Sequence, residues 1–462
     1  MNRRNFLKAA GCFLAASGNQ VFAGKSEKPN IVFILADDLG YGDVGFNGQS
    51  RIKTPNIDNI AKQGAVFTNH YSGSTVCGPS RCCLMTGKHT GHASVRGNPR
   101  WTSDGKPVDI RKEEPTVAEE LKRAGYNTCA IGKWGLAENL SHAMPTKKGF
   151  DEFFGFMRHG PAHHYYPKKV WRNEHQVSLP NKTKEKEGLY VHDLFTQEAF
   201  KYISKQDKNN PFFLYLAYTI PHYELTVPED SKEPYQKLGW KKRPMKQGHY
   251  YHDKEGHTTY AGMVSRMDRD IGSLMELLKK KGLDKNTLVI FTSDNGHHYD
   301  KGFFDSNGVY RGKKRDLYEG GIHIPFAARW PEMIRPGTKS SHISAFWDFL
   351  PTACDIAGIE PKAQTDGISY FQALKGNTRA QLSHNCLYWE FNERQGPVQA
   401  VRKDKWKAVR YKGKPIELYD LSKDPGENND ISAEYPEKAK QMVKLMESSR
   451  TKDPNFPFKK LR

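Results

Sequence analysis

Residues 31–38 read IVFILADD, an uninterrupted apolar run that ends in two aspartates. A strand with one face in water alternates apolar and polar residues, whereas a continuous apolar run indicates burial on both faces, as in a parallel sheet covered by helices. Four further runs share this character and are predicted to be buried parallel strands: Thr128–Ile131, Phe212–Tyr218, Leu288–Thr292 and Pro325–Arg329. The chain therefore contains the strands of a large sheet with both faces covered.

Segments with helical periodicity lie between these runs. In Tyr260–Lys281 the apolar residues recur every three or four positions, and two shorter segments, Thr116–Ala124 and Glu198–Lys205, are also predicted to be helical. Alternating strands and helices favour an α/β fold with a doubly wound sheet. We expect a large mixed, mostly parallel sheet flanked by helices.

The sequence pattern changes after about residue 375. Alternating residues in Leu387–Phe391, Gln399–Tyr411 and Ile416–Leu421 are typical of antiparallel strands, and a charged helix is predicted at Pro436–Ser448. We therefore expect a main domain at 24–375, which would carry the chemistry, and a small C-terminal α+β subdomain at 376–462.

The N-terminal segment resembles an export signal. MNRRNFLK is followed by a short apolar run and by VFA at 21–23, which suits signal-peptide cleavage. Arg3-Arg4 followed by Phe6-Leu7 is typical of a twin-arginine signal, and a lipoprotein signal ending at Cys12 is a weaker alternative. We expect residues 1–23 to be removed, no membrane span, and a periplasmic or extracellular location.

The protein is strongly basic. Its formal net charge is +19, and loss of residues 1–23, which hold Arg3, Arg4, Lys8 and no acid, leaves 19 − 3 = +16. Such an excess favours anionic partners such as nucleic acid, an acidic membrane or an acidic polymer. Solvated surface lysines, such as those in KTKEKEG at 182–188, explain it equally well.

Acidic and amide side chains follow two of the predicted strands. Asp37 and Asp38 follow the first, and Asp294 and Asn295 follow Leu288–Thr292. Ligands of open α/β sheets bind at the carboxyl ends of the strands, and three carboxylates gathered there would repel one another without a cation. All-oxygen ligation favours a hard ion, Ca²⁺ or Mg²⁺, over zinc. Either pair alone is more simply a turn residue pair, but both together favour a metal site.

Three nitrogen-bearing side chains are predicted at the same edge of the sheet. His222 and Lys133 close two apolar strands, and Lys314 lies in RGKKRDLYEGG, whose glycines indicate a tight loop. Each alone could be an ordinary polar residue at a strand end. Together with a metal they would form a cationic pocket that suits a tetrahedral anion such as phosphate or sulfate.

The segment VCGPSRCCLMTG at 76–87 contains three cysteines. Gly78-Pro79 indicates a turn into a helix, so Cys77 would lie at a helix N-terminus near Arg81, where anions bind and nucleophiles are activated. Cys82 and Cys83 would lie within the helix, with one or both facing the core. No matching C-x-x-C and histidine partners occur nearby, which argues against zinc.

The remaining cysteines do not form a disulfide framework. Six cysteines follow residue 23, but their spacing fits no dense pattern and a domain of this size does not need disulfides. Cys129, Cys354 and Cys386 each lie among apolar residues and are predicted to be buried free thiols.

The segment CGPSR at 77–81 resembles the C-x-P-S-R signature of the formylglycine-dependent (type I) sulfatases, of the alkaline-phosphatase-like superfamily, which include bacterial carbohydrate and aryl sulfatases. The resemblance covers nearly the whole mature chain. It includes PNIVFILADDLGYGD at 29–43, PTKKGFDEFFGF at 145–156, FTSDNG at 291–296, RGKKRDLYEGGIHIPF at 311–326 and ELYDLSKDPGENND at 417–430.

The resemblance implies a fold, a reaction and a set of roles. It implies an alkaline-phosphatase-like sheet and hydrolysis of sulfate esters, with a formylglycine-generating maturation enzyme converting Cys77 to formylglycine (3-oxoalanine). Arg81 would hold the modified residue, and Lys133, His222 and Lys314 would bind the sulfate, with His222 or Lys314 protonating the leaving group. The implied Ca²⁺ ligands are Asp37, Asp38, Cys77 as formylglycine, Asp294 and Asn295.

One position departs from the family pattern. The family commonly has a histidine two residues after the lysine, in G-K-W-H-L, but residues 132–136 read GKWGL and place Gly135 there. The base that this histidine would supply for the elimination step is therefore either missing or supplied from elsewhere. Lys88, His89 and His92 follow the nucleophile helix and could contribute, but the sequence assigns none of them.

The segment RHGPAHHYYPKKVWRN at 158–173 is rich in residues that suit sugar hydroxyls and charges, and His163 and His164 are candidate substrate-binding residues. A surface loop held by its aromatic residues explains the segment equally well. We expect a sulfated carbohydrate substrate and no nucleic-acid partner. The alternatives are a phosphodiesterase or phosphonate hydrolase of the same superfamily and a non-catalytic protein that binds sulfated glycans.

Overall fold

The computed structural model describes residues 28–457, apart from 99–101, 103, 245–249, 252, 300 and 394–395. The expected export signal at 1–23 lies outside the described residues. No helix in the described part of the chain combines the length and the apolar character needed to cross a membrane.

A ten-stranded sheet forms the centre of the protein, in the order β11-β2-β10-β9-β1-β8-β4-β5-β6-β7. The five central strands, β9-β1-β8-β4-β5, run parallel to one another. The mixed, mostly parallel sheet expected from the sequence is confirmed. Its strands are β1 Asn30–Ala36, β2 Ala65–Phe67, β4 Asn127–Lys133, β5 Glu152–Phe156, β6 Lys169–Arg172, β7 His175–Ser178, β8 Phe212–Ala217, β9 Thr287–Ser293, β10 Phe326–Arg329 and β11 Thr338–Ser340.

Strand β1 contributes to two hydrophobic cores because its side chains alternate between the faces of the sheet. Ile31, Phe33 and Leu35 pack into one core, whereas Val32 and Ile34 pack into the other. Every residue of β1 is buried. The continuous apolar run at the start of the chain is therefore explained by burial on both faces.

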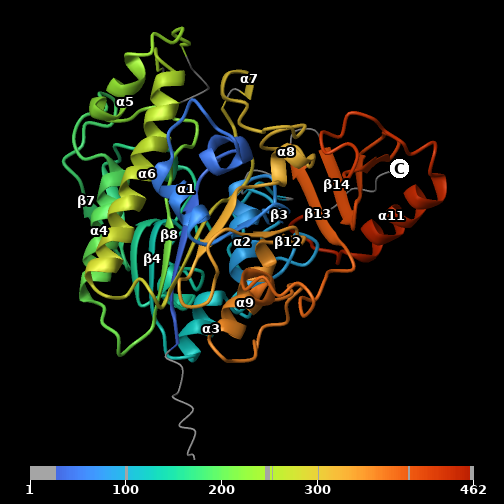
Figure 1. Ribbon diagram of the computed structural model, residues 1–462, viewed down its shortest axis with the longest axis horizontal. Helices are drawn as coiled ribbons and strands as arrows, with labels where there is room; N and C mark the ends of the chain where they lie inside the picture. The colour runs from blue at the N-terminus through green and yellow to red at the C-terminus, as the bar shows by residue number, and fades with distance from the viewer. Residues whose placement is uncertain are drawn as a thin grey trace, which may run out of the picture.

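Helices cover both faces of the sheet (Figure 1). Helices α1, α4, α5 and α6 share one core, and α2, α3, α9 and α10 share the other. The expected helix at Tyr260–Lys281 is α6, whereas the one expected at Glu198–Lys205 begins seven residues earlier as α4. The bounds are α1 Pro55–Lys62, α2 Cys77–Thr86, α3 Val117–Arg123, α4 Val191–Lys205, α5 Glu229–Gln236, α6 His257–Lys280, α7 Lys301–Phe304, α8 Glu319–Ile322, α9 Phe349–Ile356 and α10 Phe371–Leu374.

The expectation that Pro325–Arg329 is a parallel strand is wrong. This segment is β10, which runs antiparallel to β9 with Phe326 opposite Thr292. Among the residues that the structure describes between the two strands, only the short helices α7 and α8 form, and Gly296 N donates to Gly321 O over 3.0 Å. The chain thus stays at the edge of the sheet where β9 ends, and it re-enters the sheet there as β10, in the opposite direction.

A separate four-stranded antiparallel sheet, order β13-β14-β15-β16, lies beside the main sheet near the C-terminus (Figure 1). The segment Gln399–Tyr411, expected as one strand, is most of a hairpin of two strands that turns at 404–405. The strands are β13 Leu387–Glu393, β14 Gly396–Lys403, β15 Trp406–Tyr411 and β16 Glu417–Asp420, and helix α11, Pro436–Ser448, packs on this sheet. A further pair, β3 His70–Tyr71 and β12 Ser344–Ala345, is parallel.

A buried ionic contact joins the C-terminal sheet to α8, which lies between β9 and β10 in the chain. Lys407 Nζ of β15 lies 2.8 Å from Glu319 Oε1 of α8 and 3.0 Å from Glu427 Oε1, and none of the three side chains is more than 2% exposed. A buried cation between two carboxylates holds both elements in one geometry. The C-terminal sheet is thereby joined to the loop that follows β9. The division at 375/376 stays a prediction.

The described cysteines are free thiols. Cys82, Cys83, Cys129 and Cys354 are buried, as expected. Cys386, expected to be buried, is only partly so, because it lies just before β13 and packs against the margin of the C-terminal core.

Candidate active site

The carboxyl ends of β1 and β9 lie side by side, because these parallel strands pair with Ala36 opposite Ser293. The residues that follow are linked directly: Asp38 N donates to Asp294 Oδ1 over 3.1 Å, and Asn295 Nδ2 donates to Asp38 Oδ1 over 2.7 Å. Asp38 has a φ of 65° in this turn. The two acidic pairs predicted from the sequence thus form one cluster.

Buried cations neutralise this cluster. Each carboxylate has its own: Lys133 Nζ lies 2.6 Å from Asp37 Oδ2, Lys314 Nζ lies 2.7 Å from both oxygens of Asp38, and Arg81 Nη2 lies 2.8 Å from Asp294 Oδ2. All six side chains are almost completely removed from solvent. Because burial strengthens electrostatic interactions, these pairs hold the cluster in a defined arrangement.

The pKa values reflect how crowded the carboxylates are. Burial and the neighbouring charge of Asp37 raise the pKa of Asp294 to about 7, despite the Arg81 guanidinium. Burial also opposes ionisation of Asp37, but Lys133, Arg81 and Lys314 outweigh it and hold its pKa below the usual range. Neighbouring negative charge thus opposes ionisation of Asp294 even beside the three buried cations, and a further cation would relieve that repulsion.

The oxygens present suit a hard metal ion. Asp37 Oδ1 and Asn295 Oδ1 are buried and lack a hydrogen-bond partner, although buried polar atoms normally have one. Ligand atoms of Asp37, Asp294 and Cys77 also lie within 4.8 Å of one another. Carboxylate and amide oxygens are typical ligands of Ca²⁺, so these residues fit the ion expected from the sequence.

Helix α2 brings Cys77 to this cluster as its first residue. Ser80 Oγ donates to the backbone oxygen of Asp294 over 2.5 Å, and Arg81 binds the carboxylate of the same residue. Burial raises the pKa of the Cys77 thiol. The Ser-Arg pair of the CGPSR segment therefore anchors the helix on Asp294 and fixes residue 77 beside the acidic cluster.

The loop that carries Lys314 is tied to the approach to α2. Arg315 N donates to Thr75 Oγ1 over 2.8 Å, and Lys314 N donates to His297 O over 3.0 Å. These bonds hold the loop across the carboxyl end of β9. Lys314 Nζ thereby reaches Asp38.

Two imidazoles stack beside Asp38. His222 Nε2 lies 3.4 Å from Asp38 Oδ2, and the rings of His222 and His163 are parallel, with centroids 3.8 Å apart. His163 Nε2 also lies 3.5 Å from Lys133 Nζ. Burial, followed by the charges of Lys314 and Lys133, lowers the pKa of His222 well below its usual value. Lys133, His222 and Lys314 thus lie together beside the acidic cluster, and this group is called the cationic wall after its two lysines.

His164 lies next to this wall. Its Nδ1 is 2.6 Å from Glu224 Oε2, and Glu224, which also binds Lys186, is completely buried. The imidazole itself is about a third exposed, with a side-chain exposure of 30%. Sequence reasoning missed Glu224 and Lys186, because no motif connects them with residue 164.

Sequence reasoning also missed His298 and His159. His298 Nδ1 lies 3.7 Å from Asp38 Oδ2, and His159 Nδ1 lies 3.4 Å from Cys77 Sγ. Burial, then the charges of Lys133 and Arg81, lowers the pKa of His159 well below its usual value. His159 falls in the segment 158–173, whose composition indicated function without distinguishing this residue.

The basic residues after α2 make their contacts elsewhere. Lys88 pairs with Glu114, at 3.2 Å, whereas His89 and His92 stack and both contact Asp366. These contacts do not connect them with Cys77.

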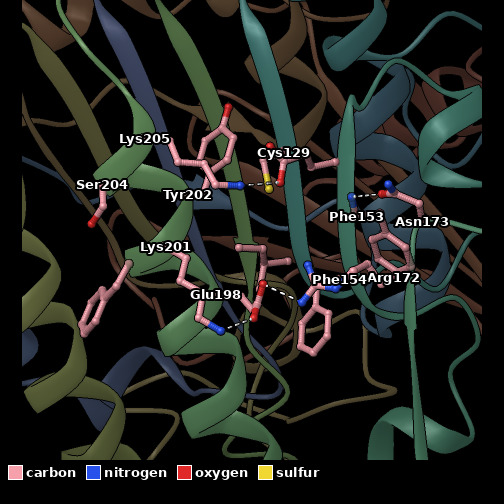
Figure 2. A pocket seen from close by; sticks show the side chains of 13 residues that line it. Cys129, Phe153, Phe154, Arg172, Asn173, Glu198, Lys201, Tyr202, Ser204 and Lys205 are labelled. Atoms are coloured by element: carbon pink, nitrogen blue, oxygen red, sulfur yellow. Dashed lines mark hydrogen bonds and ion pairs between the residues drawn. The ribbon is translucent and has the colours of Figure 1, made fainter. Parts of the chain in front are cut away.

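A pocket of about 660 Å³ lies apart from the candidate site, between α4 and β5 (Figure 2). Figure 2 shows Glu198 between Arg172 and Lys201. Its carboxylate lies 2.8 Å from Arg172 Nη2 and 2.9 Å from Lys201 Nζ. None of the clustered carboxylates, cations and imidazoles described above lines it. Its charged groups are already paired with one another.

Protein-family comparisons match two regions of the chain. Residues 29–359 match the family model described as "Sulfatase". Residues 302–452 match the model described as "N-sulphoglucosamine sulphohydrolase, C-terminal".

Individual proteins match over most of their length. The human N-acetylgalactosamine-6-sulfatase is 29% identical over 92% of this chain and 86% of that protein. The N-acetylgalactosamine-6-O-sulfatase of Bacteroides thetaiotaomicron is 29% identical over 92% of this chain and 94% of that protein. The crystal structure of Ps i-CgsB in complex with k-i-k-neocarrahexaose has a TM-score of 0.79 and 29% identity, covering 94% of this chain and 95% of that one.

Proposed function

Because the chain belongs to the sulfatase family, whose members hydrolyse sulfate esters, we propose that its substrate is a sulfated sugar, within a polysaccharide or released from one. We further propose that Cys77 is converted to formylglycine by a maturation enzyme, that Ca²⁺ completes the site, and that the enzyme is exported. The observation that carries the proposal is the position of Cys77, whose sulfur lies within 4.8 Å of ligand atoms of Asp37 and Asp294.

The metal-binding residues in this proposal are Asp37, Asp38, Asp294 and Asn295, together with residue 77. Bound Ca²⁺ would supply positive charge to a sulfate oxygen and to the nucleophile. The buried Asp37 Oδ1 and Asn295 Oδ1, which lack hydrogen-bond partners, support this ligand set. Arg81 would fix the position of residue 77 relative to Asp294, because it binds Asp294 from the same helix turn that carries Cys77.

Hydrated formylglycine would supply two hydroxyl groups on one carbon, one to attack sulfur and one whose deprotonation later expels sulfate. Lys133 Nζ and Lys314 Nζ would bind sulfate oxygens by charge-assisted hydrogen bonds. His222 or Lys314 would deliver a proton to the leaving oxygen, since both contact Asp38 on the same wall. A proton delivered there removes the need to expel an alkoxide.

A galactose-type sulfated sugar is the proposed substrate class. Two matched proteins are named for N-acetylgalactosamine sulfate, and a matched structure holds an oligosaccharide. His163 and His164 lie beside the cationic wall, and His164 is braced by the buried Glu224, so its partly exposed ring is held in one orientation. A fixed imidazole at a site entrance suits recognition of a sugar hydroxyl.

The test is a substrate screen with the matured enzyme. The full chain is co-expressed with a formylglycine-generating enzyme, and sulfate release is measured by ion chromatography from the 4- and 6-sulfates of galactose and N-acetylgalactosamine, from glucosamine 6-sulfate and from 4-nitrophenyl sulfate. A phosphodiester and a phosphonate monoester are run in parallel. We expect release from a galactose-type sulfate and none with Cys77→Ala. Faster hydrolysis of the phosphorus esters, or glycan binding without any release, would reject the proposal.

Export is tested separately. In the native host the mature chain should begin after residue 23 and be recovered outside the cytoplasm. An intact N-terminus in the cytoplasmic fraction would reject this part of the proposal.

A further inference from the structure

The glycine at position 135 leaves room for the imidazole of another residue. A Cβ atom added to Gly135 would lie 2.5 Å from His159 Cε1 and 3.0 Å from both ring nitrogens. A Cβ carbon does not approach another heavy atom as closely as 2.5 Å, so a side chain at 135 would have to displace the ring. Gly135 also has a φ of 76°, which favours glycine.

Strand pairing positions His159 over this glycine. Beyond the ends of β4 and β5 the two chains continue side by side, with Trp134 N donating to Phe156 O and Gly135 N donating to Met157 O, both over 2.9 Å. Two residues later the chain turns, with Ala162 N donating to His159 O. The main chain thus returns the His159 side chain to the strand end where residue 135 lies.

The second wall of the His159 site is helix α2. A Cβ at Gly78 would lie 3.1 Å from His159 Nε2, so a second glycine also leaves room for the ring. His159 Nδ1 faces the Cys77 side chain at 3.4 Å. The imidazole is therefore fixed between two glycines with one nitrogen against residue 77.

The other imidazoles of the site lie near Asp38. His222 and His298 lie against Asp38, and His163 is stacked on His222. His159 contacts the residue expected to be the nucleophile. His159 therefore lies beside the nucleophile, whereas His222 and Lys314 lie on the cationic wall. Two proton transfers, one to the leaving alcohol and one from residue 77, can thus be served by different groups.

We propose that His159 is the catalytic base that removes the proton from residue 77 in the step that releases sulfate. This inference rests on the proposed function. After the alcohol has left, residue 77 carries a hydroxyl and a sulfate ester on the same carbon. His159 Nδ1 accepts the hydroxyl proton, the O–H electron pair becomes the second bond of the aldehyde, and the carbon–oxygen bond to sulfate breaks with its pair leaving on sulfate. The proton then passes to solvent.

The test compares His159→Asn with wild type and with His175→Ala, a control that removes an exposed imidazole on β7. Asparagine keeps a hydrogen-bonding group near Nδ1 but does not accept a proton at neutral pH. All three proteins are matured, formylglycine content is measured, and 4-nitrophenyl sulfate is the probe. Rapid-quench kinetics report the first turnover, and mass spectrometry of the residue-77 peptide reports sulfate that remains attached.

We expect steady-state turnover of His159→Asn to fall by about 10²–10⁴-fold. The first turnover should remain, as a burst of about one nitrophenolate per active site, and the residue-77 peptide should retain sulfate. Wild type and His175→Ala should show neither burst nor retained sulfate. Imidazole added to His159→Ala should restore turnover.

Two results would overturn the inference. Unchanged turnover of His159→Asn would do so, and so would a loss in which the first turnover slows equally and no sulfate is retained, because His159 would then only position residue 77. If the wild type itself is fully converted yet turns over no sulfate ester, the proposed function fails as well. That outcome is seen in the wild type and needs no His159 variant.

Discussion

Lys133 Nζ donates a hydrogen bond to Asp37 Oδ2 over 2.6 Å, and neither side chain is exposed to solvent. Lys133 ends β4 and Asp37 follows β1, with β8 between the two strands. The pair therefore connects the cationic wall of the site with its metal-binding side across the sheet.

The first prediction concerns this pair. Lys133→Met leaves a buried carboxylate without its nearest cation, which typically costs about 3–5 kcal/mol. We expect the free energy of unfolding in urea to fall by about 3 kcal/mol and sulfate release to be lost. The control is Lys182→Met, which breaks an exposed pair with Glu187 and should cost less than about 1 kcal/mol. Equal effects of the two substitutions would show that Asp37 does not depend on Lys133.

The second prediction concerns calcium. Free Ca²⁺ at about 100 times its Kd should stabilise the native protein by about 2.7 kcal/mol, seen as a higher Tm after removal and readdition of the ion. Asn295→Leu removes an amide oxygen from the ligand set, so the Ca²⁺-induced rise in Tm should be much smaller. Asp104→Asn, at an exposed site, should keep the full rise. An undiminished rise in Asn295→Leu would remove this residue from the calcium site.

The third prediction separates sugar recognition from chemistry. His164→Ala removes an imidazole held by Glu224, and a lost hydrogen bond worth about 1.4 kcal/mol corresponds to about tenfold. We expect KM for the sulfated sugar to rise about tenfold while KM for 4-nitrophenyl sulfate stays nearly constant. His175→Ala serves again as the control. A similar rise for both substrates would assign His164 to the sulfate pocket instead of the sugar.

The fourth prediction concerns pH and stability. His384 Nε2 lies 2.7 Å from Asp348 Oδ1, and Asp348 also accepts from the backbone of Ala345 and Ile368. Burial lowers the pKa of His384, but the charge of Asp348, with a smaller contribution from Asp366, outweighs burial and raises it above the usual value. The native state therefore binds this proton more tightly than the unfolded state. Its stabilising effect is present below about pH 6.5 and is lost as the pH rises through the folded pKa.

His384→Gln removes this effect. We expect the variant to lose about 1.5 kcal/mol of unfolding free energy at about pH 5.5 and much less at about pH 8.5. Urea unfolding of both proteins at the two pH values measures the difference. A constant difference would mean that His384 has the same pKa in the folded and unfolded states, so that folding does not raise it.

Local sequence was sufficient for the central strands. The apolar runs that form β1, β4, β8 and β9 are continuous because both faces are buried, and the polar residues that follow them meet at one edge because parallel strands end there. The direction of β10 could not be predicted in this way. Its apolar run is the same in either direction, and only the path of 294–325 along the sheet edge makes it antiparallel.

The sequence predicts the site residues that lie in motifs or at the ends of strands. It does not predict the residues that only tertiary contacts bring to the site. Asp37, Asp38, Asp294 and Asn295 each follow a predicted strand, and Cys77 begins a predicted helix. His159 reaches Cys77 only because β4 and β5 pair beyond their ends and because Gly135 and Gly78 leave room for its ring. Glu224 likewise meets His164 across a separation of 60 residues. No local sequence pattern indicates which of these distant residues come into contact.

Mass spectrometry of the tryptic peptide that contains residue 77 tests the central claim most directly. In an enzyme matured and shown to release sulfate, the account predicts that Cys77 has lost its sulfur and two hydrogens and gained one oxygen, as conversion to the aldehyde requires. The converted fraction should rise in proportion to specific activity across preparations. A fully active preparation in which residue 77 is still cysteine would contradict the account.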